Sequence, residues 1–442
     1  MKRLMRQWEA SESHSAREQR ADADDVSLSH SPSPASQRPP PSPQSQRGLD
    51  WFIFFLADVQ TGFGPFVAVY LTTQKWTLGE IGLVLSIGGI VGLIGQMPGG
   101  AIIDAARSER FVAGLAVATI GMAALAYAAW PIFPVIAMAA TLHAAASCVL
   151  GPAIAAISLG LVGPAAIGER LGRNARYASL GNGAAAAIMG GIGYLLSSRA
   201  VFVVSFIFAI ATLLSLSRIR DREIDTEQAH GALSGPRPDP EATSILHLLR
   251  QRPLFIFAAA VMLLQLANAA MLPLMAGIVT ARSSTLAPLL IAASIIVPQA
   301  IVAVISPTVG RKAQAWGRRP LLMLAFAALA VRGMLFATID DPSMLVVIQV
   351  LDGITAGIFG VMVPLIVADV TFGSGHFNLA QGIVGTATGI GASLSPVIAG
   401  YASDHLGHSV AFAGLAAAAM AGLLLVFAVM PETRPRPRHG LG

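Results

Sequence analysis

The sequence predicts an all-α membrane protein in which twelve transmembrane helices form two pseudo-symmetric six-helix bundles around a central cavity. Hydrophobic residues make up 54% of the chain and charged residues only 12%, whereas globular domains average about 25% charged residues. Residues 48–430 divide into about a dozen apolar stretches, each near the ~20 residues that cross a ~30 Å hydrocarbon layer. The third observation is that basic residues are sorted between alternate connections.

This sorting predicts the orientation of the chain. If the N-terminus is cytoplasmic, the connections on that side hold all but four of the 29 Lys and Arg residues. Three of these four lie on the opposite side of the membrane, namely Lys75, Arg199 and Arg282. The fourth, Arg332, lies inside an apolar stretch. Cytoplasmic loops carry such an excess, so we expect a multi-pass protein of the cell inner membrane with both termini in the cytoplasm. The same sorting accounts for the net charge of +5 without nucleic acid as a partner.

Each stretch is predicted to be a helix, because transmembrane strands need only about 9–11 residues and alternate in polarity. The spans of the first half run roughly over residues 50–72, 79–103, 111–130, 133–161, 176–197 and 200–217. Those of the second half run roughly over residues 254–280, 286–308, 320–339, 343–369, 379–401 and 409–430.

The order of spans and polar segments divides the chain into five parts. They are a disordered cytoplasmic tail (1–47), a six-helix bundle (48–217), a cytoplasmic linker (218–252), a second six-helix bundle (253–430) and a cytoplasmic tail (431–442). Two sets of six spans around a charged linker form an internal repeat, which predicts two bundles related by an axis along the membrane normal.

No enzyme or cofactor signature is present. The sequence has no phosphate-binding Gly-x-x-x-x-Gly-Lys-Ser/Thr loop, no His-Glu-x-x-His metal motif and no Gly-x-Ser-x-Gly nucleophile elbow. Its single cysteine, Cys148, lies in an apolar stretch, which excludes a disulfide framework and a cysteine-based zinc site. We therefore expect a protein that is not an enzyme, binds no metal and needs no cofactor.

Two short connections on the basic side carry related patterns at equivalent places in the two halves. The connection after the second span runs from Gly99 to Arg110, and the one after the eighth runs from Gly310 to Pro320. Here the chain resembles the major facilitator superfamily, which carries Gly-x-x-x-Asp-Arg-x-Gly-Arg-Arg between spans two and three and a weaker copy between spans eight and nine. Neither copy is complete here, since Ala105 stands for the first Arg and Gln314 for the acid of the second copy.

We expect these connections to act as a gate. A glycine lets two helix ends approach closely, and a carboxylate can bond to the N-terminus of a neighbouring helix or to a nearby Arg. Such a clamp would hold the outward-open state and break in the inward-open one. The alternative is that these residues only anchor loops at the membrane interface. The predicted gating residues are Gly100, Asp104, Arg107, Arg110, Gly310, Gly317, Arg318 and Arg319.

Polar residues near the middle of spans are candidates for substrate or proton binding, because they are costly in hydrocarbon. The resemblance implies that spans one, four, seven and ten line the cavity, and each carries such a group. The candidates are Asp58, Gln60, His143, Gln265, Asn268 and Asp352. Burial favours protonation of a carboxylate such as Asp58, and His143 titrates near neutral pH. The alternative for both residues is a structural hydrogen bond.

Arg332 and Asp352 lie at similar depth in spans nine and ten, which a short turn makes neighbours. We expect a structural ion pair between them, with snorkelling of Arg332 to the interface as the alternative. If the pair forms, Asp352 is less available to a substrate.

The predicted function is secondary active transport of a small organic solute by alternating access. The resemblance implies protons as the coupling ion, membrane lipid as the surroundings and a monomer. Export is slightly favoured by Ser395-Pro396 to Gly400, a partial version of a pattern found in exporters of the superfamily. Uptake by a symporter or facilitator remains an alternative, as does a non-transporting membrane receptor or scaffold.

Overall fold

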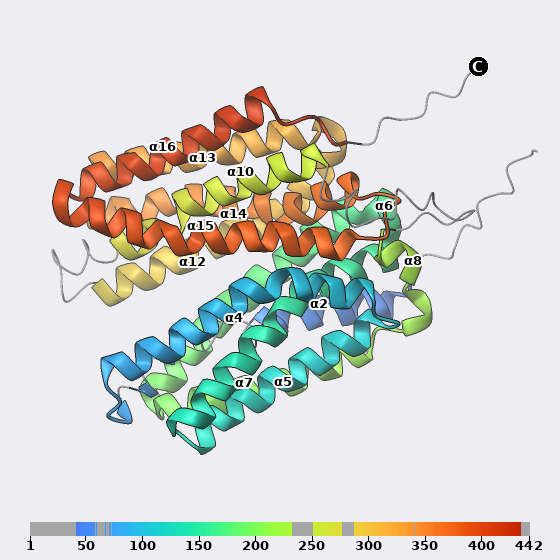
Figure 1. Cartoon of the computed structure of the whole chain (residues 1–442), viewed down its shortest axis with the longest axis horizontal. Helices are drawn as coiled ribbons and strands as arrows, with labels where there is room; N and C mark the ends of the chain where they lie inside the picture. The colour runs from blue at the N-terminus through green and yellow to red at the C-terminus, as the bar shows by residue number, and fades with distance from the viewer. Residues whose placement is uncertain are drawn as a thin grey trace, which may run out of the picture. The chain divides into compact units, whose positions relative to one another are not determined.

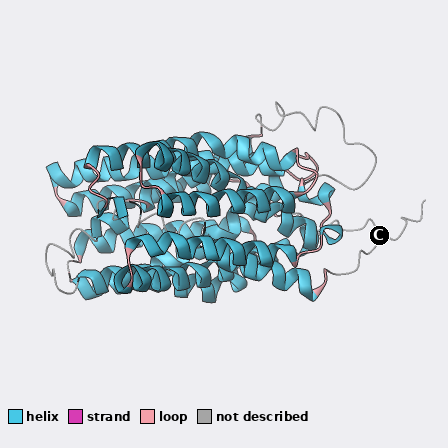
Figure 2. Cartoon of the chain, turned by 90° about the horizontal axis from the view of Figure 1, so that it is seen from below, coloured by secondary structure: helices cyan, strands magenta, loops and turns pink. Residues whose placement is uncertain are grey.

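The protein is all helix in the parts that the structure, a computed structural model, describes: residues 41–57, 59, 67, 70–71, 73–231, 251–275, 287–339 and 341–434. Figure 2 shows helices and connecting loops, and the described residues contain no strand. The chain divides into residues 1–40, which lie outside the described ranges, and one unit of residues 41–442 that carries the described helices. The predicted N-terminal tail therefore lies largely outside the described residues.

The described helices of the first half overlap the predicted spans, with different ends and one different connection, and most of the predicted first span after Ala57 lies outside the described residues. Their bounds are α2 (Pro43–Ala57), α4 (Leu78–Asp104), α5 (Glu109–Ala129), α6 (Phe133–Leu195) and α7 (Ser198–Ser217). α2 begins at Pro43, inside the segment expected to be a tail. The linker that follows contains η2 (Asp221–Glu223) and α8 (Thr226–Ala229).

The helices of the second half are α10 (Arg252–Asn268), α12 (Ala287–Trp316), α13 (Arg318–Thr338), α14 (Pro342–Val370), α15 (Phe377–Leu406) and α16 (His408–Ala428). α12 extends about two turns beyond its predicted end, so Gly310 lies in a helix and only Gly317 separates α12 from α13. Gly317 can make this sharp connection because its φ of 93° is a conformation that glycine adopts without strain.

The loop predicted between spans four and five is reduced to a break at Gly163, where two helical segments meet. α6 continues from Phe133 to Leu195 through a kink at Gly163, where φ is 71° and ψ is 172°, followed by Pro164. The prediction of a loop over residues 162–175 was wrong because Glu169, Arg170 and Arg173 made a helical segment look like a polar connection. Within the described ranges, ten helices are long and apolar enough to cross a membrane, and one of them is the kinked α6 that covers two predicted spans.

The two halves repeat the same helix pairings. In the first half α5 packs on α7, α4 on α6 and α2 on α6; in the second half α13 packs on α16, α12 on α14 and α10 on α15. In Figure 1 the blue-to-green helices form one group and the yellow-to-red helices another. Each group has a buried apolar core, and the groups meet mainly where α4 packs on α15 and α6 on α12, with further contacts of α6 with α14 and α15.

The outer surfaces of these helices are apolar. Ile94 is 68% exposed, Phe111 71% and Val304 74%. Soluble proteins rarely expose contiguous apolar surface of this kind, so these side chains face lipid. We call the side of the bundle at which α4, α7, α12 and α14 end the Arg-rich face, since the basic residues of the linker and connections gather there.

Candidate functional site

A cavity of about 630 Å³ lies between the two halves. This volume is in the range of sites for small organic ligands, about 300–1,000 Å³. Polar side chains from both halves line it, mostly amides with a few hydroxyls, among apolar residues such as Phe359. The polar lining consists of Gln96, Asn174, Ser179, Asn182, Gln265, Asn268, Gln299, Thr355, Gln381 and Thr388. The described lining can therefore bind hydrogen-bonding groups of a solute and contact its apolar parts.

Only some of the cavity residues predicted from the sequence lie there. Gln265 and Asn268 line the cavity, whereas His143 is half-buried on α6 outside the described lining. Asp352 is also outside the lining, because its carboxylate turns towards Arg332. Asp58 and Gln60 lie outside the described residues. The sequence analysis did not select Asn174 and Gln381, since each lies close to a predicted connection.

The ion pair expected inside the second half is present, with a third partner. Nη1 of Arg332 lies 2.6 Å from Oδ1 of Asp352 and also donates to Oδ1 of Asn268 at 2.6 Å. Arg332 is 1% exposed, so these acceptors take the place of water around a charge that would be very costly alone. Because Asn268 also lines the cavity, the buried charge lies next to the solute site without facing it directly.

On the Arg-rich face, the Asp104 carboxylate caps the N-terminus of α15. Oδ1 accepts hydrogen bonds from the backbone N–H of Asn378 at 3.1 Å and from its side-chain amide at 2.8 Å. Oδ2 accepts from the backbone N–H of Leu379 at 2.7 Å. The first N–H groups of a helix have no partner within the helix and carry a partial positive charge, so a carboxylate is well placed there. Asp104 thus connects the first half to the second.

Gly100 makes this contact possible. A Cβ at Gly100 would lie 2.0 Å from the carbonyl oxygen of Asn378, which no side chain allows. Gly382, one turn into α15, meets α4 in the same way, with a Cβ 2.4 Å from the carbonyl oxygen of Gln96. The backbones of α4 and α15 therefore touch at two glycines, one from each half.

The second half repeats this glycine contact with α6. A Cβ at Gly310 would lie 2.2 Å from the carbonyl oxygen of Gly168, and one at Gly172 would lie 2.5 Å from that of Ser306. Gln314, one turn after Gly310, occupies the place that Asp104 has after Gly100. Here the neighbouring helix has already begun after the kink at Gly163, so its N–H groups near Gly168 are bonded within the helix. The side-chain oxygen of Gln314 instead accepts a hydrogen bond from Nη1 of Arg318 at 3.4 Å, within the second half.

The other residues predicted in the second copy hold the start of α13. The backbone N–H groups of Arg318 and Arg319 donate to the carboxylate of Glu432 at 2.8 and 3.1 Å. The Arg318 guanidinium is buried and pairs with Asp369 at the end of α14, with Nε 2.8 Å from Oδ2. A Cβ at Gly317 would meet the Glu432 carboxylate at 2.5 Å. Residues 431–434, the start of the predicted C-terminal tail, are thus docked here.

The two arginines of the first copy differ in their surroundings. Arg110 lies 2.5 Å from Oδ2 of Asp221 and donates to the carbonyl oxygen of Ile219, so it ties α5 to the linker. Arg107 is exposed in the short connection after α4, and no partner is found for it among the described residues. Neither arginine contacts Asp104 within those residues.

A buried charge network that the sequence analysis missed joins α2 to α6. Asp50 is 1% exposed, and Oδ1 lies 2.5 Å from Nη2 of Arg170 and 2.9 Å from Nε of Arg173. Arg170 also donates to Asn174, which donates in turn to Ser158. Asp50 lies at the predicted boundary of span one and the arginines in the predicted connection, so no sequence signal paired them.

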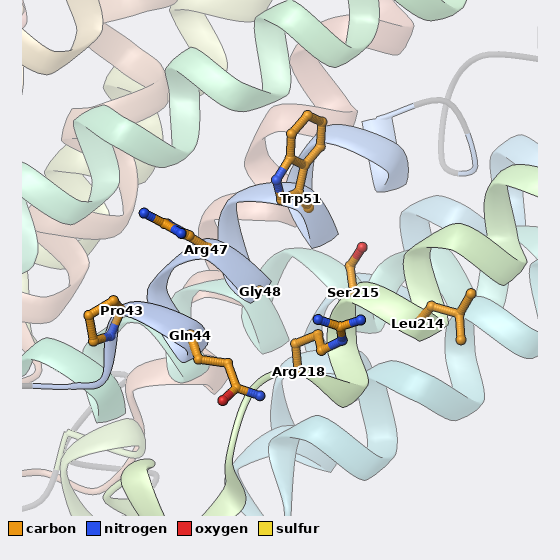
Figure 3. A pocket seen from close by; sticks show the side chains of 8 residues that line it. All are labelled: Pro43, Gln44, Arg47, Gly48, Trp51, Leu214, Ser215 and Arg218. Atoms are coloured by element: carbon orange, nitrogen blue, oxygen red, sulfur yellow. The ribbon is translucent and has the colours of Figure 1, made fainter.

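A smaller pocket of about 450 Å³ lies between the start of α2 and the end of α7 on the Arg-rich face. Figure 3 shows Arg218, with Ser215 and Leu214, to the right of Gly48 of α2, whereas Arg47 extends to the left. Because its two cations do not converge, this pocket is a weaker candidate for solute binding than the cavity between the halves.

Comparisons with known proteins agree with this architecture. The sequence pattern of the Major Facilitator Superfamily matches residues 51–303 and 267–441. An uncharacterised MFS-type transporter of Mycobacterium tuberculosis, found in strains CDC 1551 and H37Rv, is 39% identical over 410 residues, which are 90% of this chain and 97% of the relative.

Two solved structures share the fold at low sequence identity. The human organic anion transporter MFSD10 is 13% identical with a TM-score of 0.66, covering 87% of this chain and 100% of that one. The proton:xylose symporter XylE is 13% identical with a TM-score of 0.67, covering 88% and 96%. The chain belongs to the major facilitator superfamily and is a membrane transporter.

Proposed function

We propose that this transporter is a gradient-driven carrier that moves a small organic solute by alternating access, with protons as the coupling ion and export as the direction. The observation that carries the proposal is the cavity of about 630 Å³ lined by amides and hydroxyls from both halves. A site shared by two bundles can be exposed to one side and then the other when the bundles rock against each other.

The contacts on the Arg-rich face support a gate. Asp104 and the glycine contacts of α4 with α15, and of α6 with α12, hold the halves together at one end of the bundle. With the Arg-rich face in the cytoplasm, these contacts close the cytoplasmic side and must break when the cavity opens inward. The gate is asymmetric, because Asp104 caps a helix of the opposite half whereas Gln314 accepts from the Arg318 side chain of its own half.

Proton coupling requires a group that binds and releases a proton in the membrane. The ion pair with Arg332 occupies Asp352, so Asp58 in the first span is the better candidate by sequence. We expect Asp58→Asn to abolish gradient-driven transport in proteoliposomes while leaving the fold intact. Undiminished accumulation by this variant would remove Asp58 from the mechanism.

The solute and the direction can be found together by comparing metabolites inside and outside cells with and without the gene. Export predicts that one organic compound accumulates inside cells lacking the transporter and is depleted in their medium. Depletion inside those cells would instead support uptake. Membrane topology is tested by reporter fusions at Gly235 and Ser283, which should report opposite sides of the membrane.

A further inference from the structure

The linker segment 219–231 is built into the contact between the two halves. Its apolar side chains Ile219, Ile224 and Ala229 are buried in the core of the first half. The backbone N–H of Asp225 donates to the carbonyl oxygen of Gly160 at 3.0 Å. A Cβ at Gly160 would lie 2.8 Å from Ile224 and 3.2 Å from Ala229. We call this segment the strap, and it is seated on α6.

The end of the strap bonds to the second half through three carbonyl oxygens. The carbonyl oxygen of Gly231 accepts a hydrogen bond from the N–H of Gly373 at 2.7 Å. The carbonyl oxygen of His230 accepts one from the N–H of Phe377 at 3.3 Å. The carbonyl oxygen of Ala229 accepts from the side-chain amide of Asn378 at 3.3 Å. This amide is the one that donates to Asp104. The strap therefore orients the Asn378 side-chain amide, which donates to Asp104 in the contact between the halves.

One ionisable side chain holds the end of the strap against the first half. Nε2 of His230 lies 3.1 Å from Oε1 of Glu109, whose side chain is 2% exposed, at the start of α5. The charged groups that face His230 are Glu109 from α5 and Asp104 from α4, and the backbone of Ile103 forms a hydrogen bond with its ring. The carboxylates can only accept hydrogen bonds, so this environment suits an imidazolium with both ring nitrogens protonated.

The pKa of His230 follows from these contacts. Burial alone lowers it, but the neighbouring carboxylate of Glu109, together with the charge of Asp104 and the backbone of Ile103, raises the pKa above the usual value of 6.5. When the ring loses its proton, the nearly buried Glu109 loses its cationic partner. The pair is therefore strongest at low pH.

We infer that the strap is a third component of the gate on the Arg-rich face and that His230 is its positioning residue, fastening the strap to Glu109 so that Asn378 is presented to Asp104. The inference rests on the proposed function, because it assumes that the halves separate at this face during transport. A rise in cytoplasmic pH would then loosen the gate and favour the inward-open state.

The sign of the pH effect is fixed by linkage. Glu109 and Asp104 both belong to the first half, so the inference requires that the strap leaves Glu109 when the halves separate. The ring is then solvated and holds its proton less tightly than in the joined state, so protonation favours the joined state. The joined population is then highest below about pH 6.5, the pKa of a solvated histidine, and falls as pH rises through the raised pKa of the joined state. Each unit by which the pKa is raised corresponds to about a tenfold change in the equilibrium.

The test measures the distance between the halves without any substrate. Spin labels are placed on cysteines at Ser217, the end of α7, and Lys312, on α12, both exposed, in a Cys148→Ser background. Distance distributions in lipid nanodiscs are compared between about pH 5.5 and about pH 8.5, on either side of the histidine titration. Wild type should shift towards longer distances at high pH.

Variants separate the role of His230 from general stability. His230→Gln and Glu109→Gln should each reduce the joined population at low pH and flatten its pH dependence. Glu227→Gln, an exposed change on α8, is the matched control and should keep the wild-type profile. A pH dependence of the distances in His230→Gln equal to that of wild type would overturn the inference. If His230→Gln does not fold, the same comparison is made with Glu109→Gln.

The result also distinguishes this inference from the proposed function. If Asp104→Asn lengthens the distances while pH has no effect on wild type, only the role of the strap is wrong. If neither Asp104→Asn nor the change of pH alters the distances, the proposed gate and alternating access are wrong as well.

Discussion

Replacing Asp104 with Asn tests the gate at its strongest contact. The wild-type carboxylate accepts three hydrogen bonds at the N-terminus of α15. The Asn side chain keeps one carbonyl oxygen, but its NH₂ group would face an N–H donor, and the negative charge at the helix N-terminus is lost. The change is nearly isosteric, so packing of α4 against α15 at Gly100 should persist.

The expected size of the effect follows from these contacts. Hydrogen bonds to charged groups contribute about 1.5–3 kcal/mol each, and a charge at a helix N-terminus adds about 0.3–1 kcal/mol. Since Asn retains part of the bonding, we expect the joined state to lose about 2–4 kcal/mol relative to the separated one. At tenfold per 1.4 kcal/mol, the equilibrium shifts roughly 30- to 700-fold towards separation.

The assay combines the spin-label distance between Ser217 and Lys312 with transport turnover in proteoliposomes. We expect longer distances and a slower turnover, with solute affinity nearly unchanged because Asp104 is not in the described cavity lining. Glu80→Gln is the matched control, since Glu80 also accepts from a backbone N–H at a helix N-terminus but is exposed at the opposite end of α4. Equal distances and turnover in Asp104→Asn and wild type would refute the gate.

Two further predictions test the buried pair and the glycine contacts. Asp352→Asn should lower the thermal unfolding temperature in detergent, because losing one partner of a buried pair costs about 3–5 kcal/mol. The double variant Arg332→Met/Asp352→Leu should recover much of this loss. An unchanged unfolding temperature in Asp352→Asn would contradict the pairing. Gly310→Val should lengthen the spin-label distances, since a Cβ there would lie 2.2 Å from the carbonyl oxygen of Gly168. Gly414→Val has open space around its Cβ and should leave them unchanged.

The fold was predictable because hydrocarbon imposes a simple rule on sequence. Span length and the sorting of Lys and Arg depend on the lipid environment and not on any particular tertiary contact. The ion pair of Arg332 with Asp352 was predictable for a related reason, since an arginine in the membrane needs a partner and a short turn made span ten its neighbour. Asn268 was not predicted as a third partner, because its proximity depends on how α10 packs.

The rest of the site depends on contacts between distant segments. Nothing in the sequence around Asn378 indicates that its amide meets Asp104 from the other half. Arg170 and Arg173 looked like loop residues because their partner, Asp50, lies far away in the chain. His230 and Glu109 were not selected, since burial of a linker residue cannot be inferred from its polar neighbours.

Labelling of a single cavity cysteine tests the central claim most directly, namely that the cavity is open to one side at a time and that the contacts on the Arg-rich face close its cytoplasmic side. Gln265→Cys in the Cys148→Ser background places a thiol in the cavity lining. A membrane-impermeant thiol reagent is applied to right-side-out and inside-out vesicles. We predict labelling from both sides, with Asp104→Asn raising labelling from the cytoplasmic side and lowering it from the outside. Labelling from one side only, or equal labelling with and without the Asp104 change, would contradict the account.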